Sequence, residues 1–175
     1  MTRITASVLV AAALSLAACD RKPATVAPAA ANATTAADWQ LATAPADART
    51  IAEIKPTAAE GDTVVIRGRI GGRSAPITTG APVFVMMDTA IPSCAENPED
   101  NCATPWDYCC EPRDIITANS ATVQIVDEQG NPITADLAAA GFAPLDEVIV
   151  VGTVAARPSP EVLTIRATAI HRVGG

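Results

Sequence analysis

The sequence predicts a mainly β fold, a small five-stranded barrel with one short helix and one cysteine-rich insert. Three observations indicate this fold. Five segments have the composition and alternation of β-strands, and an Ala-rich segment between the third and fourth has helix-cap signals at both ends. Four of the five cysteines lie close together between the second and third strands. Aromatic residues make up only 3% of the 175 residues, so we expect a core built mostly of Val, Ile, Leu and Ala.

The first 18 residues are predicted to be an export signal. Arg3 supplies a positive charge, and the apolar run at 4–14 is too short to span a bilayer. The Leu-Ala-Ala-Cys sequence at 16–19 resembles the lipobox of bacterial lipoproteins. That resemblance implies cleavage before Cys19, diacylglycerol on its thiol and a fatty acyl chain such as palmitate on the new N-terminus. The chain would then be anchored in the bacterial cell envelope and face the periplasm. An ordinary secretory cleavage site that contains a cysteine is the alternative.

Residues 19–60 are predicted to be a lipid-anchored tether. They are rich in Ala, Thr and Pro and show little periodicity before Ile51. A coil of this length has an end-to-end distance of about 35 Å. An unpatterned spacer is favoured here, with 48–54 as the candidate for a short helix. One folded domain is then expected, at 61–175.

The five predicted strands are 63–70, 82–88, 121–127, 147–154 and 162–173. The first alternates between apolar and polar positions, which is typical of a strand with one buried face. Gly68 within it predicts a bulge or a sharp coil, as in a strand that bends around a small barrel. The second strand is apolar on both faces.

The predicted helix lies at 134–140, between the third and fourth strands. Thr134 is a suitable N-cap and Gly141 a suitable C-terminal stop. Three strands, a short helix and two strands resemble the OB-fold, over about 61–173. The resemblance depends on the opening G-D-T-V-V-I-R-G-R-I and on the closing V-I-V-V-G-T-V and L-T-I-R-A-T-A-I segments. Another small barrel or a partial sandwich is the alternative.

OB-folds commonly bind oligonucleotides or oligosaccharides, but the charge of this chain argues against nucleic acid. Its formal net charge is −7 at pH 7, whereas nucleic-acid binding needs a basic surface. The aromatic residues that could stack on bases, Trp106 and Tyr108, lie among acidic residues. We therefore predict no nucleic-acid partner.

The insert is predicted at about 89–120. Its sequence from 94 to 112 is C-A-E-N-P-E-D-N-C-A-T-P-W-D-Y-C-C-E-P. The part at 100–112 is similar to a D-N-C-x-T-P-W-D-Y-C-C-E-P segment of a group of uncharacterised envelope lipoproteins with this barrel. That similarity implies a fold and a location in the envelope, and no activity.

Four insert cysteines, Cys94, Cys102, Cys109 and Cys110, form an even set. In an exported protein such a set favours disulfides, each contributing about 2–4 kcal/mol to stability. A bond between adjacent cysteines closes a strained ring, so Cys109 and Cys110 are each expected to pair with Cys94 or Cys102. Zinc or copper ligation by these cysteines is the second interpretation, and no metal is predicted as the first choice. Thiol-redox chemistry is the third.

Trp106, Asp107 and Tyr108 are the candidate binding surface, for an envelope protein or a glycan. The alternative is that the two aromatic rings pack the insert onto the barrel. His171 is the only histidine, so a histidine-dependent catalytic set would rely wholly on it. We predict no enzymatic activity and no cofactor. The predicted function is that of a lipid-anchored binding or structural module that presents a disulfide-crosslinked insert, with a metal-binding or thiol-redox envelope protein as the alternative.

Overall fold

The computed structural model describes residues 39–97 and 99–174. The predicted signal, Cys19 and the tether as far as residue 38 lie outside the described residues. The elements in chain order are β1 (Arg49–Thr50), α1 (Ile51–Ile54), β2 (Thr63–Ile70), β3 (Val83–Met87), the 3-10 helix η1 (Cys94–Glu96), α2 (Arg113–Ala118), β4 (Ser120–Ile125), β5 (Glu147–Val154) and β6 (Thr164–Arg172). No helix among them is long and apolar enough to cross a bilayer.

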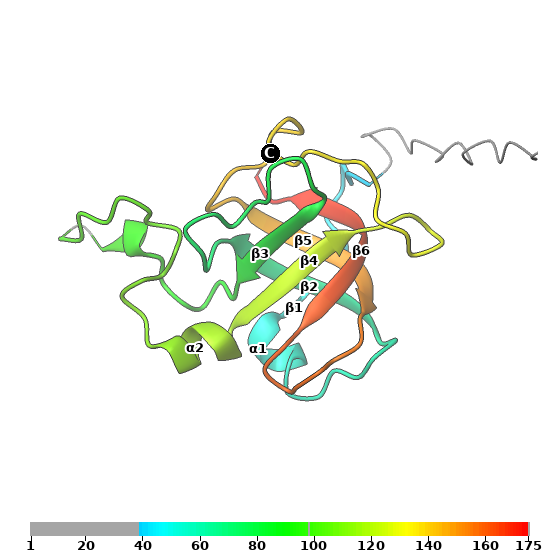
Figure 1. Cartoon of the computed structure of the whole chain (residues 1–175), viewed down its shortest axis with the longest axis horizontal. Helices are drawn as coiled ribbons and strands as arrows, with labels where there is room; N and C mark the ends of the chain where they lie inside the picture. Colours follow the sequence, from blue (N-terminus) through cyan, green and yellow to red (C-terminus); the bar gives the residue numbers. More distant parts are fainter. Residues whose placement is uncertain (1–38, 98, 175) are drawn as a thin grey trace, which may run out of the picture. The chain divides into compact units, whose positions relative to one another are not determined.

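Five strands close into a barrel (Figure 1). Their order is β2-β3-β4-β6-β5, and β5 pairs back onto β2. The β4–β6 pair is parallel and the other four pairs are antiparallel. Each barrel strand therefore has two neighbours, which removes the open edges that invite aggregation. The predicted mainly β class and the small OB-like barrel are confirmed.

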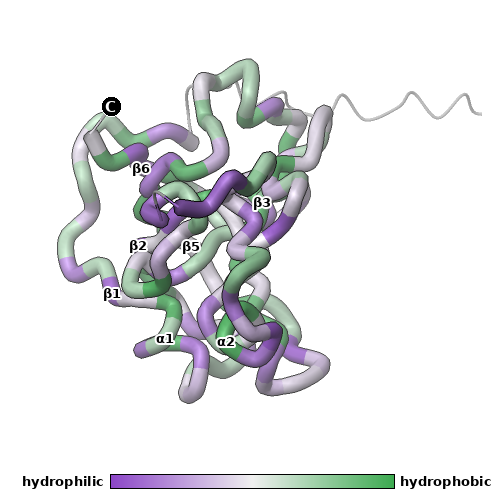
Figure 2. The backbone as a smooth tube through the Cα atoms, turned by 90° about the vertical axis from the view of Figure 1, so that its left-hand side faces the viewer, coloured by the Kyte–Doolittle hydropathy of each residue, from purple (hydrophilic) through white to green (hydrophobic). Residues whose placement is uncertain are grey.

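In β2 and β4 every second residue is buried, as the alternation predicts. In β2, Val64, Ile66 and Ile70 face the core, while Arg67 and Arg69 lie on the other face. Figure 2 shows hydrophobic and hydrophilic stretches mixed along the chain. Gly68 does not form the predicted bulge, because its pairing with β5 is regular. A Cβ at this glycine would lie 2.3 Å from the Met86 side chain, so the residue makes room for core packing.

The helix predicted at 134–140 is wrong. Asp136 caps a single turn, accepting a hydrogen bond from the Ala139 amide at 3.1 Å. Gly141 then takes a φ of +89° and ends the turn. The segment is fixed as a turn by Leu137, which is fully buried in the core. The helix that precedes β4 is α2, inside the insert region.

Residues 39–60, predicted to belong to the tether, pack against the barrel. Trp39 is buried and stacks on Phe142 with ring centroids 5.5 Å apart. In α1, Ile51 and Ile54 are buried. Thr50 caps this helix by accepting a hydrogen bond from the Glu53 amide, and the Glu53 carboxylate accepts one from the Thr50 amide in return. The domain therefore includes these residues, because their apolar side chains complete its core.

Lys55 is a buried cation next to α1. Its Nζ donates hydrogen bonds to the backbone carbonyl oxygens of Thr117 in α2 and Ser120 in β4. Burial, followed by the charge of Arg157, lowers the pKa of Lys55 from 10.5 to about 8. Lys55 thus joins α1 to the segment where the insert returns to the barrel.

The stability of the fold is expected to rise with pH between about 8 and 10.5, the pKa values of Lys55 in the folded and the unfolded chain. There the unfolded chain still holds the Lys55 proton and the folded chain has lost it, so the unfolded state binds more protons and raising the pH favours folding. Urea denaturation at about pH 7 and about pH 9.5 measures this rise. A Lys55→Met variant is expected to lose most of it. Equal pH slopes for the two proteins would contradict the assignment to Lys55.

Candidate functional site

The insert leaves the barrel after β3 and returns at β4, and it projects to one side (Figure 1). Its base is held by Asp88, which is fully buried. The Asp88 carboxylate accepts hydrogen bonds from the amides of Ala52 and Ala90, at 2.8 and 2.9 Å. Its own amide donates to the carbonyl oxygen of Asn119 at 2.8 Å. The carboxylate of Asp88 therefore fixes the first end of the insert against α1, and its backbone amide fixes the second end.

The first part of the insert is anchored by Glu96. Its carboxylate accepts hydrogen bonds from the amide and hydroxyl of Ser93, at 3.0 and 3.1 Å, which caps η1. It also forms an ion pair with Arg69 of β2, with Nη1 and Oε1 2.5 Å apart. The Ser93 amide, more than Arg69, lowers the pKa of Glu96. These contacts position Cys94, the first residue of η1.

The second part of the insert docks on the loop after β2. The Gly72 amide donates to the carbonyl oxygen of Trp106 at 2.8 Å, and the Trp106 indole donates to the carbonyl oxygen of Ser74 at 3.0 Å. Tyr108 is fully buried. Its ring lies so close to Gly71 that a Cβ there would be 2.8 Å from it. Trp106 and Tyr108 therefore pack the insert onto the barrel.

The loop after β2, on which the insert docks, covers part of the outer face of β3. Phe84 and Met86 face the core, so Val85 and Met87 point outward. Both are nevertheless buried, at 7% and 0% exposure. A Cβ on Gly72 would meet both side chains, which places the loop after β2 directly over them. In OB-folds the face of the second and third strands binds ligands, and here part of that face is occupied by the chain itself.

The predicted binding surface at 106–108 needs a correction. Tyr108 has a φ of +59° and its ring is in the interior, so it is not available to a partner. Trp106 is half-buried and its indole nitrogen is bound to the loop after β2. Asp107 turns toward the cysteines, as described next. The left-handed residue at Tyr108 was not predictable from its type, because tyrosine rarely adopts that conformation.

The four insert cysteines come together, as the sequence predicts. The Sγ atom of Cys109 lies 3.4 Å from that of Cys102 and 3.8 Å from that of Cys94. Asp107 Oδ1 lies 3.9 Å from the Cys102 sulfur. These four ligand atoms all lie within 4.8 Å of one another. We call Cys94, Cys102, Asp107 and Cys109 the inner cluster. Both sulfur separations exceed the bond length of a disulfide, about 2.05 Å.

Asp107 is held in the inner cluster by two hydrogen bonds. Thr104 Oγ1 donates to Oδ2 at 2.6 Å, and the Cys109 amide donates to Oδ1 at 2.9 Å. Partial burial raises the pKa of Asp107, but these bonds outweigh it and the net pKa is lowered. The carboxylate is therefore ionised and fixed in orientation.

Cys110 lies outside the inner cluster. Its thiol donates to Asp100 Oδ2 at 2.9 Å. Cys110, Asp100 and Cys94 form a second group of ligand atoms, and Cys94 belongs to both groups. The hydrogen bond to Asp100 raises the pKa of Cys110 to about 11, and the contact with Cys102 raises the pKa of Cys109 further still.

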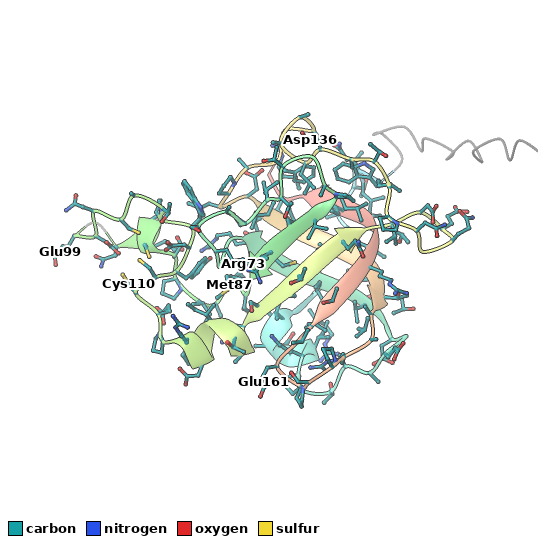
Figure 3. The ribbon with its side chains drawn as sticks, viewed as in Figure 1. Arg73, Met87, Glu99, Cys110, Asp136 and Glu161 are labelled. Carbon is teal, nitrogen blue, oxygen red and sulfur yellow. The ribbon has the colours of Figure 1, made fainter. Side chains whose placement is uncertain are left out.

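A hollow of about 200 Å³ opens beside Cys110. Its lining contains three carboxylates and two thiols, and consists of Pro92, Ser93, Cys94, Glu96, Asn97, Asp100, Cys110 and Glu111. In Figure 3, Glu99 marks the outer end of the insert and Cys110 lies nearer the barrel. The outward side of the insert is therefore acidic.

Comparison with known proteins identifies no family. No family model and no curated protein matches the sequence. Among solved structures, the chain is similar to a protein assigned as an aspartyl-tRNA synthetase from Leishmania major Friedlin, with 14% identity and a TM-score of 0.41 over 76% of this chain and 22% of that one. It is also similar to the aspartyl tRNA synthetase from Entamoeba histolytica, with 12% identity and a TM-score of 0.43 over 78% and 25%. The chain spans about a quarter of the length of these structures.

Proposed function

We propose that this chain is a lipid-anchored protein of the bacterial cell envelope, without enzymatic activity, whose barrel holds the insert as a recognition element. The anchor is the lipid on Cys19, implied by the lipobox resemblance at 16–19. The partner is an envelope protein or a glycan. The net charge of −7 argues against nucleic acid.

The observation that carries this proposal is the docking of the insert onto the loop after β2. Tyr108 and Trp106 fix its inner side, and Asp88 fixes its two ends. What the insert presents outward is then held in one geometry, which lowers the entropy cost of binding. The barrel face that OB-folds use is partly covered, so the recognition surface is the outer side of the insert, including Glu99 and Asn101.

The cysteines can close the insert in two ways. Two disulfides, the first expectation from the sequence, would pair Cys102 with its near neighbour Cys109 and leave Cys94 for Cys110. Each pair would pass two electrons and two protons to a disulfide oxidant of the envelope. Metal ligation is the second way, and the convergence of four ligand atoms in the inner cluster is the observation that favours it.

Photo-crosslinking from the insert tests the recognition proposal. A photo-reactive residue at Glu99, which is exposed at the outer end of the insert, is expected to capture an envelope protein or a glycan in cells that express the full chain. The same residue at Thr168, exposed on β6 of the barrel, is the matched control. We expect capture from position 99 to exceed that from position 168 at least several-fold.

The anchor is tested in the same cells. The full chain should sediment with membranes and take up labelled palmitate, and a Cys19→Ala variant should do neither. Equal capture from positions 99 and 168 would remove the insert as the recognition element. A chain that takes up no label would remove the lipid anchor.

A further inference from the structure

The inner cluster has the donor set and the spacing of a metal centre. Four-coordinate zinc binds thiolates at about 2.3 Å, so neighbouring sulfurs in its tetrahedron lie about 3.8 Å apart. The two measured sulfur separations are 3.8 and 3.4 Å. A carboxylate oxygen and a sulfur on the same ion lie about 3.6 Å apart by the same geometry, and Asp107 Oδ1 is 3.9 Å from the Cys102 sulfur.

The carboxylate in the set already has the support that metal ligands need. Ligating carboxylates are themselves hydrogen-bonded by neighbouring groups, which fix their orientation. The Thr104 hydroxyl donates to Asp107 Oδ2 at 2.6 Å. The amide of Cys109, itself a member of the cluster, donates to Oδ1 at 2.9 Å. Asp107 is therefore oriented toward the cluster before any ion arrives.

The backbone at Tyr108 is a second, independent indication. A non-glycine residue in the left-handed region costs about 1–2 kcal/mol, and such residues gather at ligand clamps and functional sites. At Tyr108, with φ of +59°, this conformation brings both flanking residues, Asp107 and Cys109, into one cluster while the ring is buried. Cys94 approaches from η1, which the Arg69–Glu96 ion pair ties to β2.

We propose that the inner cluster is a mononuclear zinc site, with Cys94, Cys102, Cys109 and Asp107 as its four ligands. Each thiol releases its proton to solvent when the ion binds. A carboxylate among the ligands favours zinc over Cu(I), which prefers sulfur ligands alone. Four protein ligands leave no open position, so the site is structural and performs no hydrolysis. The inference rests on the proposed function in one respect only: the insert that the ion would hold in place is the proposed recognition element.

Cys110 is not a ligand in this arrangement, and this separates the proposal from both alternatives. Its thiol is bonded to Asp100 and belongs to a different group of ligand atoms, together with Cys94. A four-cysteine site would require it. Two disulfides would require it as well, since they use all four sulfurs.

The test is metal analysis of the exported full chain, extracted from membranes in detergent without reductant or chelator. We expect about one zinc ion per chain and four alkylatable insert thiols after the ion is removed. Cys109→Ser should lose the zinc, and Asp107→Asn should weaken Zn²⁺ binding by 10-fold or more, in a titration against a chromogenic chelator. Cys110→Ser, the matched control, should bind zinc as the original chain does. Far-UV circular dichroism of each variant checks that the barrel is intact.

Three outcomes would overturn the proposal. Four missing protons with no metal would establish the two disulfides instead. Equal loss of zinc in Cys110→Ser and Cys109→Ser would establish a four-cysteine site. A copper ion in place of zinc would overturn the choice of metal. Each leaves the photo-crosslinking result untouched, so failure of the zinc site and failure of the recognition element are distinguishable.

Discussion

Replacing Gly152 with alanine is expected to lower the free energy of unfolding by about 3 kcal/mol. A Cβ at this position would lie 2.2 Å from the carbonyl oxygen of Arg166 and 2.8 Å from the Cα of Ala167. Both are backbone atoms of β6, so no side-chain rotation can relieve the clash. Gly152 also pairs with Val64 of β2 on the other side. The two strands that flank β5 would have to separate, which opens the barrel.

Urea denaturation of the full chain measures this loss. Gly130→Ala is the matched control, because its φ is +82° and a Cβ there meets nothing within 4 Å. It should cost only the left-handed strain of about 1–2 kcal/mol. If Gly152→Ala lost no more stability than Gly130→Ala, the close approach of β5 to β6 at Gly152 would not cost what its distances predict.

The barrel was predictable because it follows from local alternation. Each predicted strand overlaps the strand that forms, through alternation in β2 and β4 and through a continuous apolar run in β3. The closeness of β5 and β6 at Gly152 was not predictable, because it arises at a register shift between strands. Pairing between distant segments leaves no periodic signal in either one.

Packing onto the barrel explains two differences between the predicted and the observed structure. The chain at 39–60 resembles a spacer in composition, yet Trp39 finds a partner in Phe142, far along the sequence. The Ala-rich segment at 134–140 has helical composition, but burying Leu137 in the core fixes it as a turn. In both cases a long-range apolar contact outweighs the local preference, and such contacts have no local signature.

The site was predictable in part. Four cysteines within a short insert must lie near one another, and they do. The role of Asp107 as a member of the cluster depends on the turn at Tyr108 and on the Thr104 hydroxyl, neither of which a residue pattern reveals. The prediction that Asp107 and Tyr108 belong to one binding surface was wrong for the same reason. Their side chains point in different directions from the turn at Tyr108.

Truncating Tyr108 to alanine is expected to lower the free energy of unfolding by about 4 kcal/mol, within the range for removing a buried aromatic ring. The ring fills the space against Gly71, in the same loop whose Gly72 lies over Val85 and Met87 on the outer face of β3. Without it the insert loses its main apolar contact with the barrel. We expect urea denaturation to show the loss of stability, and limited proteolysis of the folded variant to show faster cleavage within the insert.

Tyr108→Phe separates packing from the polar contact of the hydroxyl. The Tyr108 hydroxyl lies 3.5 Å from Arg69 Nη1, at the limit of a hydrogen bond, so its removal should cost less than about 1 kcal/mol. Phenylalanine keeps the ring and should keep the insert resistant to protease. If Tyr108→Ala left the insert equally resistant, the ring would not be what docks it. The hydrogen bonds of Trp106, the Arg69–Glu96 ion pair and the buried carboxylate of Asp88 would then be what holds the insert.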